Sequence, residues 1–159
     1  MTPRWWRRDI AALFPDPSAG YRGTRLALWA LVAMTALTTA RSLVHVLAPD
    51  GGAGSIAGLD VSVEGGANLI ALFGQWGWEQ LLLAVVTVVI LVRYRFLVPF
   101  AWLLQALDWG GRMLVGELKP LVVAAPPPGA IGNWVFLPLA LFALWFALPR
   151  RCPPDGRHG

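Results

Sequence analysis

Four long apolar segments dominate the pattern of hydrophobic and polar positions along the chain. They occupy residues 26–48, 69–92, 96–116 and 131–149. At a rise of 1.5 Å per residue, each segment is long enough as a helix to cross about 30 Å of hydrocarbon. The pattern therefore predicts an all-α integral membrane protein, folded as an antiparallel four-helix bundle.

The segments before and after this pattern are shorter and more polar. Residues 4–14, "RWWRRDIAALF", combine arginine and tryptophan with a short apolar stretch, which is typical of a helix lying in the membrane interface. We therefore divide the chain into an N-terminal segment with an interfacial helix, residues 1–21, a transmembrane domain, residues 22–149, and a cytoplasmic tail, residues 150–159. In the loop 49–68, alternating apolar residues predict a short strand or an interfacial lid.

The composition agrees with a membrane protein. Of the 159 residues, 57% are hydrophobic and 14% are charged. The net charge of +4 does not indicate nucleic-acid binding, because the basic residues flank apolar segments and form no recognition motif. The single cysteine, Cys152, excludes a disulfide or a redox pair within one chain.

The basic residues also predict the orientation of the helices. If both termini and the turn at 93–95 lie on one side, that side holds ten of the 13 basic residues. The positive-inside rule then places both termini in the cytoplasm. The ten residues are Arg4, Arg7, Arg8, Arg22, Arg25, Arg93, Arg95, Arg150, Arg151 and Arg157.

Polar residues from all four segments are expected at a similar depth. Counted from the cytoplasmic arginine that flanks each segment, they lie about 20 to 30 Å along their helices. Buried charges in a bilayer need partners, so we expect the two arginines to neutralise the two acids in an inward-facing polar layer nearer the outer side. The predicted layer comprises Arg41, His45, Gln75, Glu79, Asp108, Arg112 and Asn133.

This layer has two interpretations. It can fix the order and rotation of the helices, or it can form a pocket that opens outward. Tryptophans beside it would suit a lipid or another amphipathic ligand, and the candidates are Trp76, Trp109 and Trp134. No metal-binding motif is present, and the sequence identifies no cofactor.

The leading functional hypothesis is an inner-membrane protein whose pocket binds a lipid or hydrophobic small molecule, or an accessory subunit that contacts another membrane protein or a second copy of itself. One alternative is a lipid-modifying or isomerising enzyme, with His45 as acid or base and Glu79 or Asp108 as its partner. Another is a small oligomeric transporter. Whether the chain is an enzyme stays open at this point.

Four strings have the look of sequence motifs: "RSLVHVLAPDGGAGSIAG", "NLIALFGQWG", "RYRFLVPFAWLL" and "PPPGAIGN". In size and four-span layout, residues 22–149 resemble small bacterial inner-membrane proteins of the DoxX-like kind. The resemblance implies an architecture and carries over no activity and no functional residue.

Overall fold

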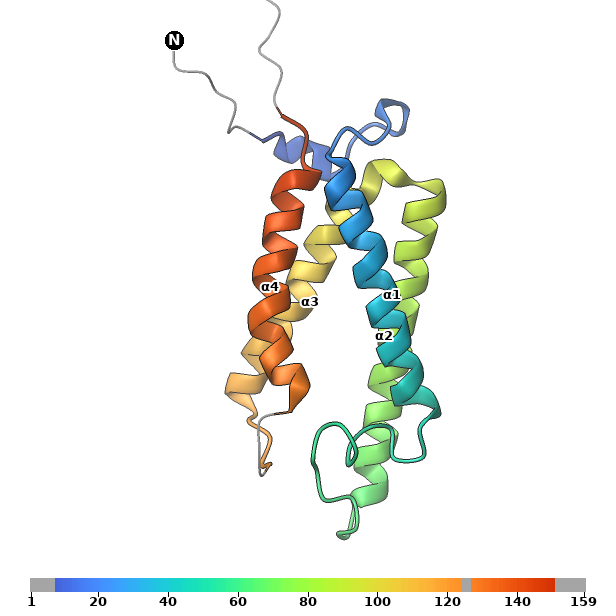
Figure 1. The fold of residues 1–159 in the computed structure, drawn as a ribbon, viewed down its shortest axis with the longest axis vertical. Helices are drawn as coiled ribbons and strands as arrows, with labels where there is room; N and C mark the ends of the chain where they lie inside the picture. Colours follow the sequence, from blue (N-terminus) through green and yellow to red (C-terminus); the bar gives the residue numbers. More distant parts are fainter. Residues whose placement is uncertain (1–7, 124–126, 151–159) are drawn as a thin grey trace, which may run out of the picture.

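The computed structural model describes residues 8–123 and 127–150, and its long elements are four helices (Figure 1). Within the described residues there is no strand, only an isolated bridge between Arg8 and Arg150. The prediction of an all-helical chain is therefore confirmed for this part. The helices are α1 (Arg25–Leu47), α2 (Gly66–Arg93), α3 (Val98–Leu118) and α4 (Pro128–Ala147), each within three residues of a predicted segment at both ends.

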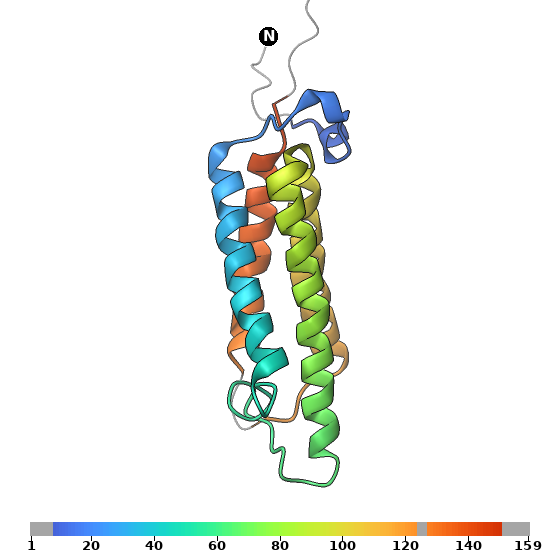
Figure 2. The ribbon, with the colours of Figure 1, turned by 90° about the vertical axis from the view of Figure 1, so that its right-hand side faces the viewer.

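All four helices extend along the long axis of the molecule (Figures 1 and 2). The loop between α1 and α2 lies at one end, together with the C-terminal end of α3 and the N-terminal end of α4. The N-terminal segment and the turn between α2 and α3 lie at the other end. Helix α1 packs mainly against α2, and α3 against α4, so the molecule consists of two helical hairpins placed side by side.

Three of the helices, α1, α2 and α4, are long and apolar enough to cross a membrane. Helix α3 has a comparable length of 21 residues but carries Asp108, Arg112 and Glu117. The structure therefore supports three of the four predicted spans by length and composition, and α3 is distinguished by its charges.

A close-packed core joins the two hairpins in the half nearer the N-terminal segment. Trp102 of α3 is fully buried and donates a hydrogen bond from Nε1 to the carbonyl oxygen of Ala27 on α1, at 3.0 Å. Buried alanines of α4, such as Ala140 and Ala143, pack into the same cluster. The small side chains of these alanines leave space that the large indole ring of Trp102 fills, and they also let the helix backbones approach closely.

A close contact between α1 and α2 fixes their rotation in the other half. A Cβ atom added at Gly77 would lie 2.5 Å from Cβ of His45 and 3.1 Å from the carbonyl oxygen of Ser42. Only glycine fits at this point, because any side chain would push the two helices apart. Gly77 therefore determines which face of α2 meets α1.

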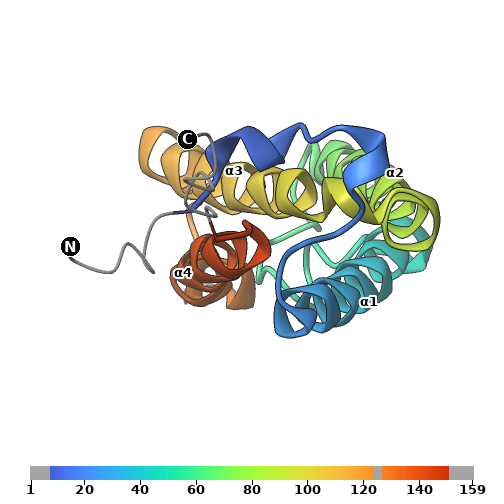
Figure 3. The same ribbon diagram turned by 90° about the horizontal axis from the view of Figure 1, so that it is seen from above.

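The predicted helix over residues 4–14 is wrong in its described part. Residues 4–7 lie outside the described residues, and the remainder forms only a short 3-10 turn, Ile10–Leu13. The amide of Asp9 donates to the carbonyl oxygen of Pro149 at 3.0 Å, which fastens the segment to the end of α4. Pro15 follows directly, so an α-helix cannot continue. The segment crosses the ends of the helices (Figure 3).

Of the two alternatives for the α1–α2 loop, the short strand is wrong: residues 49–57 fold as successive turns, residues 58–61 have no regular structure, and residues 62–65 form a bend and a turn. Asp50 organises the successive turns: its carboxylate accepts hydrogen bonds from the amides of Ser55, at 2.6 Å, and Gly52, at 2.9 Å. These hydrogen bonds lower the pKa of Asp50 to about 2, and the bond from the Ser55 amide has the largest effect. Gly52 has φ +74°, a backbone conformation that favours glycine, and such turns interrupt a strand.

Candidate functional site

Two arginines and two tryptophans meet between the hairpins, in the half of the molecule away from the N-terminal segment. The guanidinium of Arg41 lies over the rings of Trp76, at 5.2 Å, and Trp109, at 5.5 Å. The guanidinium of Arg112 lies over the same two rings, at 5.1 and 4.5 Å. We call these four residues the arginine–tryptophan cluster. It links α1 and α2 of one hairpin to α3 of the other by cation–π contacts.

Asp108 supplies the negative charge of this region. It lies one turn before Arg112 on α3 and accepts two hydrogen bonds from its guanidinium, Nη2 to Oδ2 at 2.7 Å and Nε to Oδ1 at 3.2 Å. The side chains are 14% exposed for Arg112 and 27% for Asp108, so the pair is reachable from the surface of the helices. Such a forked contact holds the guanidinium in one orientation.

Arg41 has a neutral partner instead. It donates a hydrogen bond from Nη2 to Oε1 of Gln80 on α2. Gln80 is buried, at 4% exposure, and its Nε2 has no hydrogen-bond partner in the described part of the chain. The same is true of Nε1 of Trp109, also 4% exposed. Trp109 of the cluster and the adjoining Gln80 therefore carry buried N–H donors that lack acceptors among the described residues, which is costly unless a further group provides them.

Gln80 was missed by the sequence reasoning, although a signal for it exists. The buried positions of α2 include Gly77, Gln80, Ala84 and Thr87, which follow one another at steps of three and four. This stripe of small and polar residues marks the face that packs against α1. Its register predicts that Gln80 and Trp76 point inward.

Two residues predicted to belong to the layer lie on another face of α2. Gln75 and Glu79 are exposed, and Glu79 forms no ion pair with any described residue. The expected pairing of Glu79 with Arg41 or Arg112 is therefore wrong. The reason is rotation: the pair 75 and 79 is offset by one residue, about 100° around the helix, from the inward pair Trp76 and Gln80.

On α4 the structure separates the two predicted residues. Trp134 is 71% exposed and takes no part in the cluster. Asn133 is partly buried, and its Oδ1 has no donor among the described residues. Phe136, which was not predicted, stacks against Trp109 with ring centres 4.7 Å apart.

His45 lies beside the cluster and is bound to the loop. It is buried, its ring lies 4.9 Å from that of Trp76, and its Nδ1 donates to the carbonyl oxygen of Gly51 at 2.7 Å. Neither Glu79 nor Asp108 hydrogen-bonds to it. In the described ranges, no three histidine, cysteine or acidic side chains gather as metal ligands.

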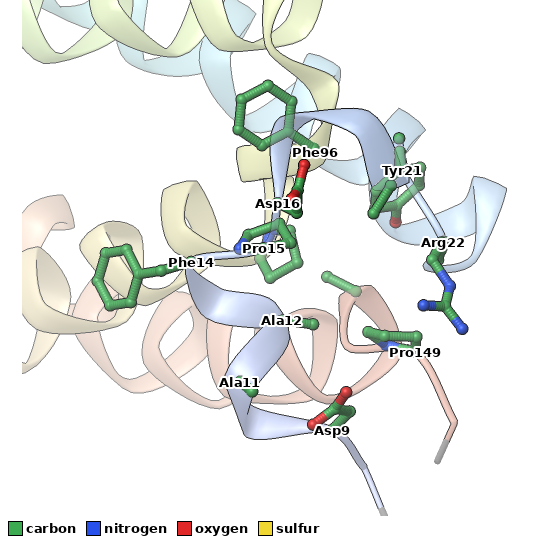
Figure 4. Close-up of a pocket in the computed structure, with 14 residues that line it drawn as sticks. Asp9, Ala11, Ala12, Phe14, Pro15, Asp16, Tyr21, Arg22, Phe96 and Pro149 are labelled. Carbon is green, nitrogen blue, oxygen red and sulfur yellow. The ribbon is translucent and has the colours of Figure 1, made fainter. Parts of the chain in front are cut away.

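A cavity of about 330 Å³ lies at the opposite end, between the N-terminal segment and the helix ends (Figure 4). Its polar groups are largely used within the chain. Asp16 accepts hydrogen bonds from Ser18, and the hydroxyl of Tyr21 donates to the carbonyl oxygen of Thr24 at 2.8 Å. Burial raises the pKa of Tyr21 to about 12. These bonds indicate that the segment is anchored here, and they leave the arginine–tryptophan cluster as the candidate site.

Comparison of the chain with models of known families, with curated proteins and with solved structures finds no match. The resemblance to DoxX-like proteins thus has no support from these comparisons. The candidate site must be interpreted from its own geometry.

Proposed function

We propose that the chain is an integral protein of a bacterial inner membrane, with four antiparallel spans and both termini in the cytoplasm. Three helices have the required length and apolarity. The fourth helix, α3, differs from these three by its charged residues, and two of them, Asp108 and Arg112, form an ion pair with each other. Ten of the 13 basic residues lie at or beyond one end of the spans in this arrangement.

The lone cysteine allows a direct test of this orientation. Cys152 lies in the tail, outside the described residues, and a membrane-impermeant maleimide should label it only after the cells are permeabilised. As a control, Ser55→Cys in a Cys152→Ser background should be labelled in spheroplasts, because the α1–α2 loop faces outward. Labelling with the opposite pattern would contradict the proposed orientation.

For the site, we propose that the arginine–tryptophan cluster binds a lipid or another hydrophobic small molecule. The observation that carries this proposal is the pair of guanidiniums held over Trp76 and Trp109, inside a set of mainly apolar helices. Beside them lie buried donors that have no acceptor among the described residues. A purely structural cluster would be expected to satisfy its own hydrogen bonds. Indole rings also provide apolar contact area for an acyl chain.

Native mass spectrometry of the purified protein in a mild detergent tests this proposal. We expect a retained lipid or small molecule on the wild type. Trp76→Leu, which removes one wall of the cluster, should lose it. Trp134→Leu is the matched control, because Trp134 is exposed and outside the cluster. If all three proteins retain the same adducts, the cluster is not the binding site, provided that thermal unfolding shows the variants to be folded.

A second candidate function is that of an accessory subunit or homo-oligomer. Gln75 and Glu79 lie one turn apart on an exposed face of α2, and a carboxyl group facing lipid favours a partner helix. Glu79→Leu should then reduce the oligomer seen by native mass spectrometry, whereas Leu82→Ala, on an exposed apolar position, should not. A wild type that is monomeric and binds no other protein would refute this candidate.

The enzyme alternative has less support. It needs His45 in contact with a carboxylate, whereas His45 contacts the loop, and Asp108 is bound to Arg112. The transporter alternative also has less support. The sequence shows no internal repeat, and helix α1 has no acidic residue at its centre.

A further inference from the structure

The charges of the cluster do not balance. Arg41 and Arg112 face the same two rings, yet the structure shows one carboxylate with them, Asp108, which binds Arg112. Among the described residues, the hydrogen-bond acceptor of Arg41 is the neutral amide oxygen of Gln80. Within the described residues, the two guanidiniums and one carboxylate leave a net charge of +1 between the helices. A cation in this position is costly, so an anion from outside the chain would stabilise it.

The unused hydrogen-bonding groups point to the same chemistry. Nε2 of Gln80 and Nε1 of Trp109 are buried donors that find no acceptor among residues 8–123 and 127–150. Oε1 of Gln80 already accepts a hydrogen bond from Arg41, whereas its N–H groups have no partner among the described residues. Asn133 Oδ1 is an exception, as an acceptor without a donor, and the Ser42 hydroxyl can act either way. Two of these four groups need an acceptor and a third can use one, and an oxyanion provides acceptors only.

The two arginines have different roles in this arrangement. Arg112 is oriented by Asp108, which already occupies two of its N–H groups. Arg41 makes one hydrogen bond to the described residues, from Nη2, and its guanidinium lies over two indole rings. A planar guanidinium held in this way presents its N–H fork to phosphate or carboxylate oxygens.

We propose that the cluster binds the oxyanion of its ligand, a phosphate or carboxylate group, and that Arg41 supplies the charge that recognises it. This inference rests on the proposed function, because it takes the bound molecule to be an amphiphile. A lipid headgroup and a free phosphate ion share this chemistry, and the experiment must separate them.

The experiment uses the full-length protein in a maltoside detergent and native mass spectrometry. The probes are phosphatidic acid, diacylglycerol with the same acyl chains, and inorganic phosphate, each added separately. We expect phosphatidic acid to be retained at least about tenfold more than diacylglycerol, as charge-assisted hydrogen bonds would provide. Inorganic phosphate alone should bind weakly, because it lacks the acyl chains.

Arg41→Gln should reduce the retention of phosphatidic acid to the level of diacylglycerol. Lys119→Gln is the matched control, because it removes the same charge from an exposed position just beyond α3. If Arg41→Gln does not fold, Arg41→Lys provides the test, since it keeps the charge, loses the planar fork and should give intermediate retention.

Each outcome separates the two proposals. Equal retention of phosphatidic acid and diacylglycerol overturns oxyanion recognition and leaves lipid binding intact. Binding of inorganic phosphate, dependent on Arg41 and without any lipid, supports oxyanion recognition and refutes the lipid. Retention of none of the probes overturns both.

Discussion

Two tryptophans of α3, Trp102 and Trp109, lie seven residues apart on the same face of the helix, and they have opposite environments. Both are buried. The indole N–H of Trp102 donates to Ala27 and its ring is surrounded by apolar side chains. The indole N–H of Trp109 has no acceptor among the described residues, and its ring faces two guanidiniums.

The comparison contrasts a region that holds the two hairpins together with the region where we propose that a ligand binds. The one polar group of Trp102, its indole N–H, is satisfied within the chain, as expected of a side chain that holds the hairpins together. Around Trp109, donors and positive charge exceed the acceptors that the described residues provide. Regions that break the rule of satisfied buried polar groups are often functional, which is why we locate the site there.

Trp102→Ala should have the largest effect on stability. It removes a fully buried ring from the junction of α1, α3 and α4, and such changes cost about 3–5 kcal/mol in soluble proteins. Thermal unfolding in detergent should show a much lower midpoint than for Trp134→Ala, at an exposed tryptophan. Equal midpoints for the two variants would mean that the half around Trp102 is not the stabilising one.

Asp108→Asn should move stability and binding in opposite directions. The change frees Arg112 of its ion pair, which destabilises the unliganded protein, and it raises the net charge of the cluster from +1 to +2. Retention of phosphatidic acid should increase by about tenfold, which equals about 1.4 kcal/mol. Glu79→Gln is the control, because it neutralises an exposed acid outside the cluster. Weaker retention in Asp108→Asn would show that the pair, and not the excess charge, holds the ligand.

Changing each tryptophan to phenylalanine compares the two indole N–H groups directly. Trp102→Phe loses a satisfied hydrogen bond and ring volume, and should cost about 1–3 kcal/mol. Trp109→Phe removes an N–H that has no acceptor, so the unliganded protein should lose less than Trp102→Phe does. Binding of phosphatidic acid, by contrast, should fall only in Trp109→Phe. The reverse order of the two unfolding midpoints would contradict this assignment.

The smallest expected effect comes from protonating or removing the carboxylate of Asp50, which changes the local stability of the α1–α2 loop. This loop contacts the cluster through His45. The pKa of Asp50 in the folded protein, about 2, lies below the ordinary value of 3.8, so the charged form stabilises the loop. This stabilisation is complete above about pH 4 and is lost as the pH falls to about 2. Hydrogen-exchange protection of the Ser55 amide should fall over this range in the wild type and stay low throughout in Asp50→Ala. Constant protection in the wild type would exclude Asp50 as the organising group.

The sequence predicted the helices well because apolar length and the arginines at their ends mark them strongly. It also predicted that Arg41, Asp108, Arg112, Trp76 and Trp109 lie near one another. Rotation was harder: Gln75 with Glu79 and Trp76 with Gln80 are equally good i,i+4 pairs. The choice depends on the contact of Gly77 with His45, which is a tertiary feature. The N-terminal segment was mispredicted because hydrogen bonds to the end of α4 replace those of a helix.

The most direct test of the central claim is a distance measured by solid-state NMR between the indole nitrogen of Trp109 and the phosphorus of retained phosphatidic acid. In a phosphorus-free detergent, the retained lipid is the only source of the phosphorus signal. We predict that the nitrogen lies within about 4 Å of phosphorus, as expected for an indole N–H donating to a phosphate oxygen, and that the coupling disappears in Trp109→Phe and Arg41→Gln. A coupling that persists unchanged in both variants, or retained phosphatidic acid with no coupling in the wild type, would contradict the account.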